Sequence, residues 1–109
     1  MSQNPNAEVE INALLAELWQ RHLPSTRERL DTLDQLALLA SANQLDEATR
    51  VEGQSVAHKL AGNLGMFGYS AAGEIASEIE QIFKAPNTET LPRLATLAQQ
   101  LRQTLSPYL

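Results

Sequence analysis

The middle of the chain, residues 55–68, reads Ser55-Val56-Ala57-His58-Lys59-Leu60-Ala61-Gly62-Asn63-Leu64-Gly65-Met66-Phe67-Gly68. Projected at about 100° per residue, this stretch forms a helix with one apolar face centred on Leu60. The other apolar residues of that face, each within about 60° of Leu60, are Val56, Ala57, Leu64 and Phe67. His58 lies about 160° from Leu60, so its imidazole projects outward beside Gly62 and Gly65. The stretch therefore predicts an amphipathic helix with a histidine and two glycines on its exposed face.

The two glycines beside His58 are unusual in a helix. Each costs roughly 0.5–1 kcal/mol relative to alanine. A sequence selected for stability alone would have glutamate, lysine or alanine there. Because glycine has no side chain, both positions leave an open approach to the imidazole, so a bulky partner or a group carried on the ring could sit close to the helix backbone.

Apolar residues recur at helical spacing on both sides of this stretch. Leucine and alanine dominate the apolar residues, valine and isoleucine are sparse, and no alternating run of β-branched residues occurs, which favours helix over strand. The predicted helices span residues 7–22, 26–41, 45–66, 70–84 and 89–106. Pro24 marks the end of the first helix, and Ser25 with Glu28 forms a predicted capping box for the second.

Amphipathic helices joined by short links predict an all-α fold, an antiparallel four-helix bundle with an additional N-terminal helix. The first helix is expected to cap one end of the bundle. Its apolar stripe consists of Ile11, Leu14, Leu15, Leu18 and Trp19. Since every helix has one such stripe and the bundle core would bury all of them, we expect a monomer.

The composition limits the classes of function. A length of 109 residues suits a single domain over residues 1–109. The net charge of −5 argues against nucleic-acid binding, which needs a basic face. The absence of cysteine excludes thiolate chemistry and disulfides. No apolar run is long enough to span a membrane, and the polar start, residues 1–6, is no signal peptide. We therefore expect a cytoplasmic protein, or a cytoplasmic domain of a larger chain, with no membrane partner.

The exposed imidazole of His58 is the one group that points to chemistry. General base catalysis wants a pocket and a second catalytic group, and neither is visible in the sequence. A metal site wants more ligands, but the only other histidine is His22 on another predicted helix, so no metal site is expected. Nucleophilic catalysis remains, because an imidazole nitrogen can accept a phosphoryl group and pass it on. Such a site needs accessibility.

The stretch around His58 resembles the histidine-containing phosphotransfer (HPt) domains of two-component phosphorelay systems. Their signature is alanine-His-x-leucine-lysine-glycine with a further glycine ten residues after the histidine, and residues 57–62 and Gly68 match it except at Ala61. Phe67 also matches the version found in chemotaxis kinases. The likeness covers most of the chain. It implies that His58 is the phosphoacceptor and that Gly62 leaves room for the phosphoryl group and a receiver domain.

The resemblance implies roles for several further residues. In related domains a carboxylate on the following helix often binds the other imidazole nitrogen, and Glu80 lies in the matching place. An ordinary carboxylate at the edge of the apolar stripe is an equally good interpretation of Glu80. The residues expected to contact phosphate or a receiver are Ser55, Lys59, Gly62 and Met66. Lys59 has a second interpretation as a solvated surface charge. Met66 has a second interpretation as a core residue at the helix end. His22 is interpreted as a helix-end residue without a function.

One position departs from the family pattern. Related domains usually have lysine three residues after the histidine, where this chain has Ala61. A charge-assisted contact to phosphate is worth roughly 1.5–3 kcal/mol. The departure therefore affects the transfer rate, the stability of the phosphohistidine or the choice of partner, and leaves the nucleophile in place.

The sequence predicts a phosphorelay intermediate that exchanges a phosphoryl group between His58 and an aspartate of a response-regulator receiver domain, with a histidine kinase or hybrid kinase as a further partner. No Walker-type loop is present, so no kinase or ATPase activity of its own is expected, and no cofactor besides Mg²⁺ on the receiver. The alternative is a non-catalytic module of the same fold that docks on a receiver or kinase without carrying phosphate. A metal or cofactor bundle would need inward polar ligands, but the apolar stripes are nearly all aliphatic.

Overall fold

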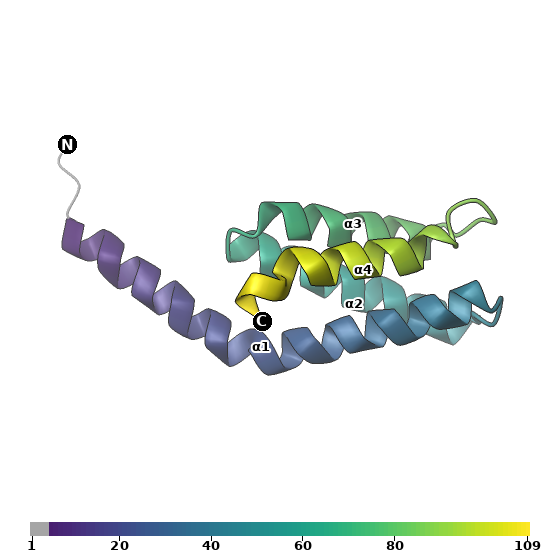
Figure 1. Cartoon of the computed structure of the whole chain (residues 1–109), viewed down its shortest axis with the longest axis horizontal. Coiled ribbons are helices and arrows are strands. Elements are labelled where there is room, and N and C mark those ends of the chain that lie inside the picture. The colour runs from purple at the N-terminus through teal and green to yellow at the C-terminus, as the bar shows by residue number, and fades with distance from the viewer. Residues whose placement is uncertain (1–4) are drawn as a thin grey trace.

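The computed structural model describes residues 5–109, with side chains described from residue 7, and this part of the chain forms helices and no strand. The α-helices span Pro5–Ser41 (α1), Glu47–Met66 (α2), Ser70–Lys84 (α3) and Arg93–Leu105 (α4), and a 3₁₀ turn, η1, follows at Ser106–Tyr108. Successive helices run in opposite directions (Figure 1), and each packs against two neighbours in the cyclic order α1, α2, α3, α4. The predicted all-α bundle is confirmed. Residues 1–4, part of the polar start, lie outside the described residues.

Pro24 lies inside α1, so the predicted division into helices at 7–22 and 26–41 is wrong. Proline removes one N–H and crowds the carbonyl four residues earlier, which kinks a helix. Figure 1 shows α1 bending near its middle. The helix continues through the bend because residues on both sides of Pro24 are buried, namely Trp19, Leu23, Thr26 and Leu30.

Ser25 does not cap a helix. Its hydroxyl donates to the carbonyl oxygen of His22 at 3.0 Å, so the capping box predicted with Glu28 is wrong. A capping box forms instead at the start of α2. There the carboxylate of Asp46 accepts from the N–H of Thr49 at 2.8 Å, and the hydroxyl of Thr49 accepts from the N–H of Asp46 at 2.9 Å. The pKa of Asp46 is lowered most by the hydrogen bond from the backbone N–H of Thr49 and next by the hydrogen bond from the Thr49 hydroxyl.

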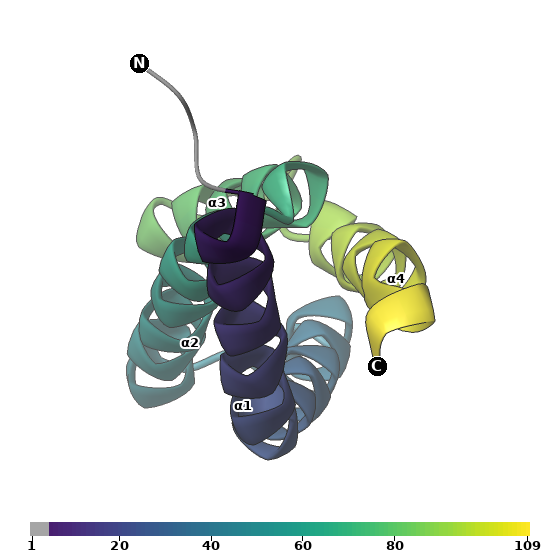
Figure 2. The same cartoon turned by 90° about the vertical axis from the view of Figure 1, so that its left-hand side faces the viewer.

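The first part of α1 projects beyond the bundle (Figure 1), and in the view from that side it lies in front of the other helices (Figure 2). We call residues 7–18 the arm. Ile11 and Leu14 are 57% and 54% exposed, and of the predicted stripe only Trp19 is fully buried. The expectation that this stripe belongs to the core, on which the expectation of a monomer rested, is therefore wrong. The arm extends past the end of the bundle and leaves most of its apolar face uncovered.

The C-terminal segment begins its helix later than the predicted range of 89–106. The side chain of Asn87 accepts from the N–H groups of Glu89 and Thr90, each at 2.9 Å, and this local structure holds residues 87–92 in turns before α4 starts at Arg93.

At the other end, η1 brings the C-terminus back to α1. The indole of Trp19 donates to the carbonyl of Tyr108 at 3.0 Å.

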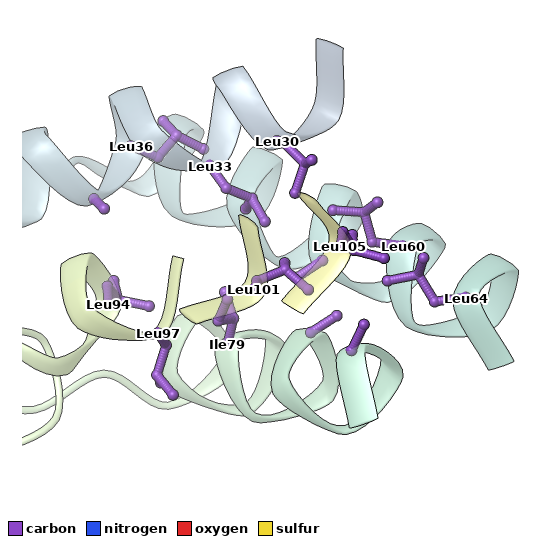
Figure 3. Close-up of a cluster of buried hydrophobic side chains, with 14 of the residues drawn as sticks. Leu30, Leu33, Leu36, Leu60, Leu64, Ile79, Leu94, Leu97, Leu101 and Leu105 are labelled. Carbon is purple, nitrogen blue, oxygen red and sulfur yellow. The ribbon is translucent and has the colours of Figure 1, made fainter. Parts of the chain in front are cut away.

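The core lies between the four helices. Leucines of α1, α2 and α4 converge on one interior together with Ile79 of α3 (Figure 3). The largest fully buried side chains are Phe83, Leu30, Leu33, Leu60, Leu64, Ile79, Leu94, Leu101 and Leu105. Within the described residues, no helix is both long and apolar enough to cross a membrane.

Gly53 of α2 packs against Phe83 of α3. A Cβ atom at this position would lie 2.5 Å from Cε1 of Phe83, so the absence of a side chain lets the phenyl ring rest on the backbone of α2. Gly62 differs, because a Cβ atom there would meet nothing within 4 Å. The same residue type therefore has a packing role at Gly53 and none at Gly62.

We predict that Gly53→Ala destabilises the fold by about 1–3 kcal/mol, because the added methyl group overpacks a buried ring and outweighs the gain in helix propensity. The matched control, Gly62→Ala, should stabilise the fold by about 0.5–1 kcal/mol. Urea unfolding followed by circular dichroism measures both variants. Equal stability of the two variants would contradict the packing role of Gly53.

Candidate functional site

His58 stands on the outer face of α2, as its projection predicts. Its side chain is 74% exposed. Ala57, Leu60 and Leu64 on the opposite face are buried at 1% exposure or less, and they fix the orientation of the helix. The imidazole is thus presented to solvent from a rigid helix.

Glu80 of α3 meets His58 across the seam between the two helices. Oε2 of Glu80 lies 2.9 Å from Nδ1 of His58. The side chain of Glu80 is only 17% exposed, because the core residues Ile79, Ile82 and Phe83 hold this part of α3 against the bundle. An ionised carboxylate only accepts hydrogen bonds, so Nδ1 must donate. The neutral ring then has its hydrogen on Nδ1 and its lone pair on Nε2.

The glycines after His58 have two different roles. Gly62 and Gly65 lie inside α2, exposed, and a Cβ atom at either position would meet nothing within 4 Å. Tight packing against a neighbouring helix therefore does not explain Gly62. Gly68 has a φ of +85°, a left-handed conformation that suits glycine, and it lies in the turn that ends α2.

An open hollow of about 410 Å³ adjoins the imidazole. The residues that line it are Val51, Gln54, Ser55, His58 and Glu80. The structure thus brings together three of the predicted site residues, His58, Glu80 and Ser55. The sequence analysis missed Val51 and Gln54, although their spacings of seven and four residues before His58 place them on the same helix face.

The other predicted contact residues lie outside the lining of the hollow. Lys59 is exposed on the flank of α2. Met66 is 58% exposed at the end of α2, so it is not a core residue. Ala61 is partly buried and faces α3, where its carbonyl oxygen would lie 3.6 Å from a Cβ atom at Gly73.

His22 lies away from this site and inside α1, so its interpretation as a helix-end residue is wrong. Its ring packs edge-on against Phe67, with the ring centroids 5.4 Å apart. In the described part of the chain, no group of three or more histidine, aspartate or glutamate side chains could hold a metal ion.

The amino-acid sequence matches a known family of domains. The chain matches the model of the Hpt domain over residues 17–106. It is 38% identical to the protein RcaC of Microchaete diplosiphon over 68 residues, which are 62% of this chain and 10% of RcaC. The chain therefore spans about a tenth of the length of that relative. No solved structure matches the chain significantly.

The family match covers α2, α3 and α4 and most of α1, and it includes both His58 and Glu80. It starts at residue 17, so it omits nearly all of the arm. The helical bundle and the sequence match agree. The chain belongs to the Hpt domain family, whose domains have a phosphotransfer-related role in two-component signalling.

Proposed function

We propose that the protein is a phosphorelay intermediate, in which Nε2 of His58 accepts a phosphoryl group and exchanges it with an aspartate of a response-regulator receiver domain. The observation that carries the proposal is the 2.9 Å contact between Nδ1 of His58 and Oε2 of Glu80. This contact selects the tautomer in which the exposed nitrogen has the lone pair. The exposure of the ring and the empty space at Gly62 supply the access that a large partner needs.

The transfer step balances without movement of a proton. The lone pair on Nε2 attacks the phosphorus of an aspartyl phosphate, and the bond between phosphorus and the aspartyl oxygen breaks. Its electrons leave with the aspartate as a carboxylate. The ring keeps its hydrogen on Nδ1 and becomes a phosphorylated imidazolium, whose positive charge lies against the carboxylate of Glu80. Glu80 is thus a positioning residue that also stabilises the charged product.

The partners of this role are proteins that complete the active site. Family membership supports interaction with receiver domains and with histidine or hybrid kinases. The receiver would supply the aspartate and its Mg²⁺, so the chain itself would need no cofactor and would have no kinase activity of its own. On this proposal a docked receiver covers the face around His58 and contacts Ser55, Gly62, Lys59 and Met66.

The alternative function is a module of this fold that docks on a receiver or kinase without carrying phosphate. Ala61 favours this alternative, since it removes the cation that related domains usually place beside the phosphate. The ordered pair of His58 and Glu80 favours phosphotransfer, because a docking module has no need of a defined imidazole tautomer.

We predict that the wild-type protein acquires one acid-labile phosphoryl group from a phosphorylated receiver and that His58→Gln acquires none. Intact-mass measurement before and after acid treatment checks both results, and circular dichroism verifies the fold of the variant. If the folded wild type stays unlabelled by several competent donors, the docking module becomes the better proposal.

Glu80→Gln should slow phosphorylation of His58 by roughly tenfold or more, because an amide can donate to Nδ1 and so favour the unreactive tautomer. The rate of labelling by phosphoramidate, a small chemical donor, measures this effect without any docking partner. Glu78→Gln on the same helix is the control, since Glu78 pairs with Arg93 and not with His58. Equal rates for the two variants would remove Glu80 from the mechanism.

Gly62→Ala should reduce transfer from a phosphorylated receiver by about tenfold or more, because a small displacement of the reacting groups has a large effect on rate. Labelling by phosphoramidate should change far less, since that donor is small. Gly65→Ala adds the same methyl group about 10 Å from His58 along the helix and should have the smaller effect. Unchanged receiver transfer in Gly62→Ala would show that the space at this position is not used.

A further inference from the structure

The hollow beside His58 is almost without charge. Among the residues that line it, Glu80 has the one carboxylate and none is lysine or arginine, and the carboxylate is bound to Nδ1 of His58. A phosphoryl group on Nε2 would bring about two negative charges to this face. Ala61, one turn after His58, has no polar side chain to receive them. The hydrogen-bond donors that the hollow itself offers to the phosphoryl oxygens are therefore neutral.

The turn of α2 that precedes His58 contains two neutral hydrogen-bond donors. Side chains of an α-helix lean towards its N-terminus, so the imidazole of His58 lies over the preceding turn. That turn contains Gln54 and Ser55, which line the same hollow. The polar side chains of Gln54 and Ser55 therefore share one hollow with the imidazole that would carry the phosphoryl group.

Gln54 is held in a defined orientation by Arg50. Nη1 of Arg50 lies 3.3 Å from Oε1 of Gln54 and also donates to the carbonyl of Phe83 at 3.0 Å. The other guanidinium nitrogens bind the carboxylate of Glu47 at 2.8 and 2.6 Å. Because a guanidinium only donates, the oxygen of the Gln54 amide must face Arg50. The NH₂ end of Gln54, with its two hydrogens, is then the end left to bind a ligand.

We infer that the side-chain NH₂ of Gln54 donates a hydrogen bond to the phosphoryl group on His58, with Arg50 as the residue that positions it. This inference rests on the proposed function of His58. It assigns to the hollow a phosphoryl-binding role that uses a neutral amide in place of a cation. The covalent step is unchanged, since Gln54 neither gives up nor takes a proton.

The test uses the whole protein labelled with phosphoramidate. In this reaction Nε2 of His58 attacks phosphorus, the P–N bond of the donor breaks, and ammonia leaves with its electrons and its three hydrogens. After removal of the donor, the half-life of the phosphohistidine is followed by ³¹P NMR. Hydrolysis proceeds through a loose state in which the phosphoryl group leaves the ring, so a donor that holds its oxygens lengthens the half-life.

Gln54→Leu should shorten the half-life by about threefold to tenfold, because it removes a hydrogen bond to a charged group. Gln54→Glu keeps the contact with Arg50 and places a carboxylate in the hollow, so its phosphohistidine should have a shorter half-life still. If Gln54→Leu fails to fold, Gln54→Glu tests the role of Gln54 in its place. Gln99→Glu, on an exposed position of α4, is the matched control and should keep the wild-type half-life.

A spectroscopic measurement separates direct contact from a structural effect. The side-chain amide signal of Gln54, identified by its loss in Gln54→Leu, should move downfield in a ¹H–¹⁵N spectrum when His58 is phosphorylated. Arg50→Met should weaken this shift, and the conservative variant Arg50→Lys should restore part of it. These readouts test the positioning role of Arg50 apart from its effect on stability.

The outcomes distinguish the two proposals. In one outcome the wild type takes the label while both Gln54 variants keep the wild-type half-life and the amide signal does not move. This result would overturn the role of Gln54 and leave the proposed function standing. Wild type that takes no label at His58 would overturn the proposed function and this inference with it. Shortened half-lives together with a moved amide signal would establish the contact.

Discussion

The close packing of α2 against α3 is the constraint on which the site depends. At one end of the seam, Gly53 lets the ring of Phe83 lie on the backbone of α2. At the other end, Gly73 faces the backbone of α2 at Ala61 and Gly65, where a Cβ atom on Gly73 would lie 3.6 Å from the carbonyl oxygen of Ala61. His58 and Glu80 lie between these two contacts along their helices. The pair can meet at hydrogen-bonding distance because small residues set the separation of the helices on either side of it.

The sequence was sufficient for the parts of this structure that depend on local periodicity. The apolar pattern predicted α3 at 70–84 correctly and α2 within two residues, and with them the outward direction of His58. It could not show that Gly53 is a packing residue, because Phe83 lies thirty positions later and a helical glycine alone has several explanations. Gln54 was missed for a similar reason, since only the contact with Arg50 gives its amide a defined direction.

The errors at α1 and α4 have physical causes of other kinds. Proline disfavours the interior of a helix, so Pro24 predicts a helix end, but burial on both sides of the bend outweighs the lost hydrogen bond. The stripe of the arm has the pattern of a buried face and is nevertheless uncovered in the structure. The start of α4 is delayed by the side chain of Asn87, which organises a turn that competes with the helix.

The contact between Trp19 and the C-terminal turn provides an optical reporter within the molecule. Trp19 is the single tryptophan of the chain, it is 5% exposed, and its indole is bonded to the carbonyl of Tyr108 and packed against Phe67 and Tyr69. Its fluorescence therefore reports on the junction of α1, the turn after α2 and the C-terminus. Release of the last residues would expose the indole to water and shift its emission to the red. Events confined to the hollow beside His58 leave this junction intact, so the emission separates loosening of the junction from chemistry at the imidazole.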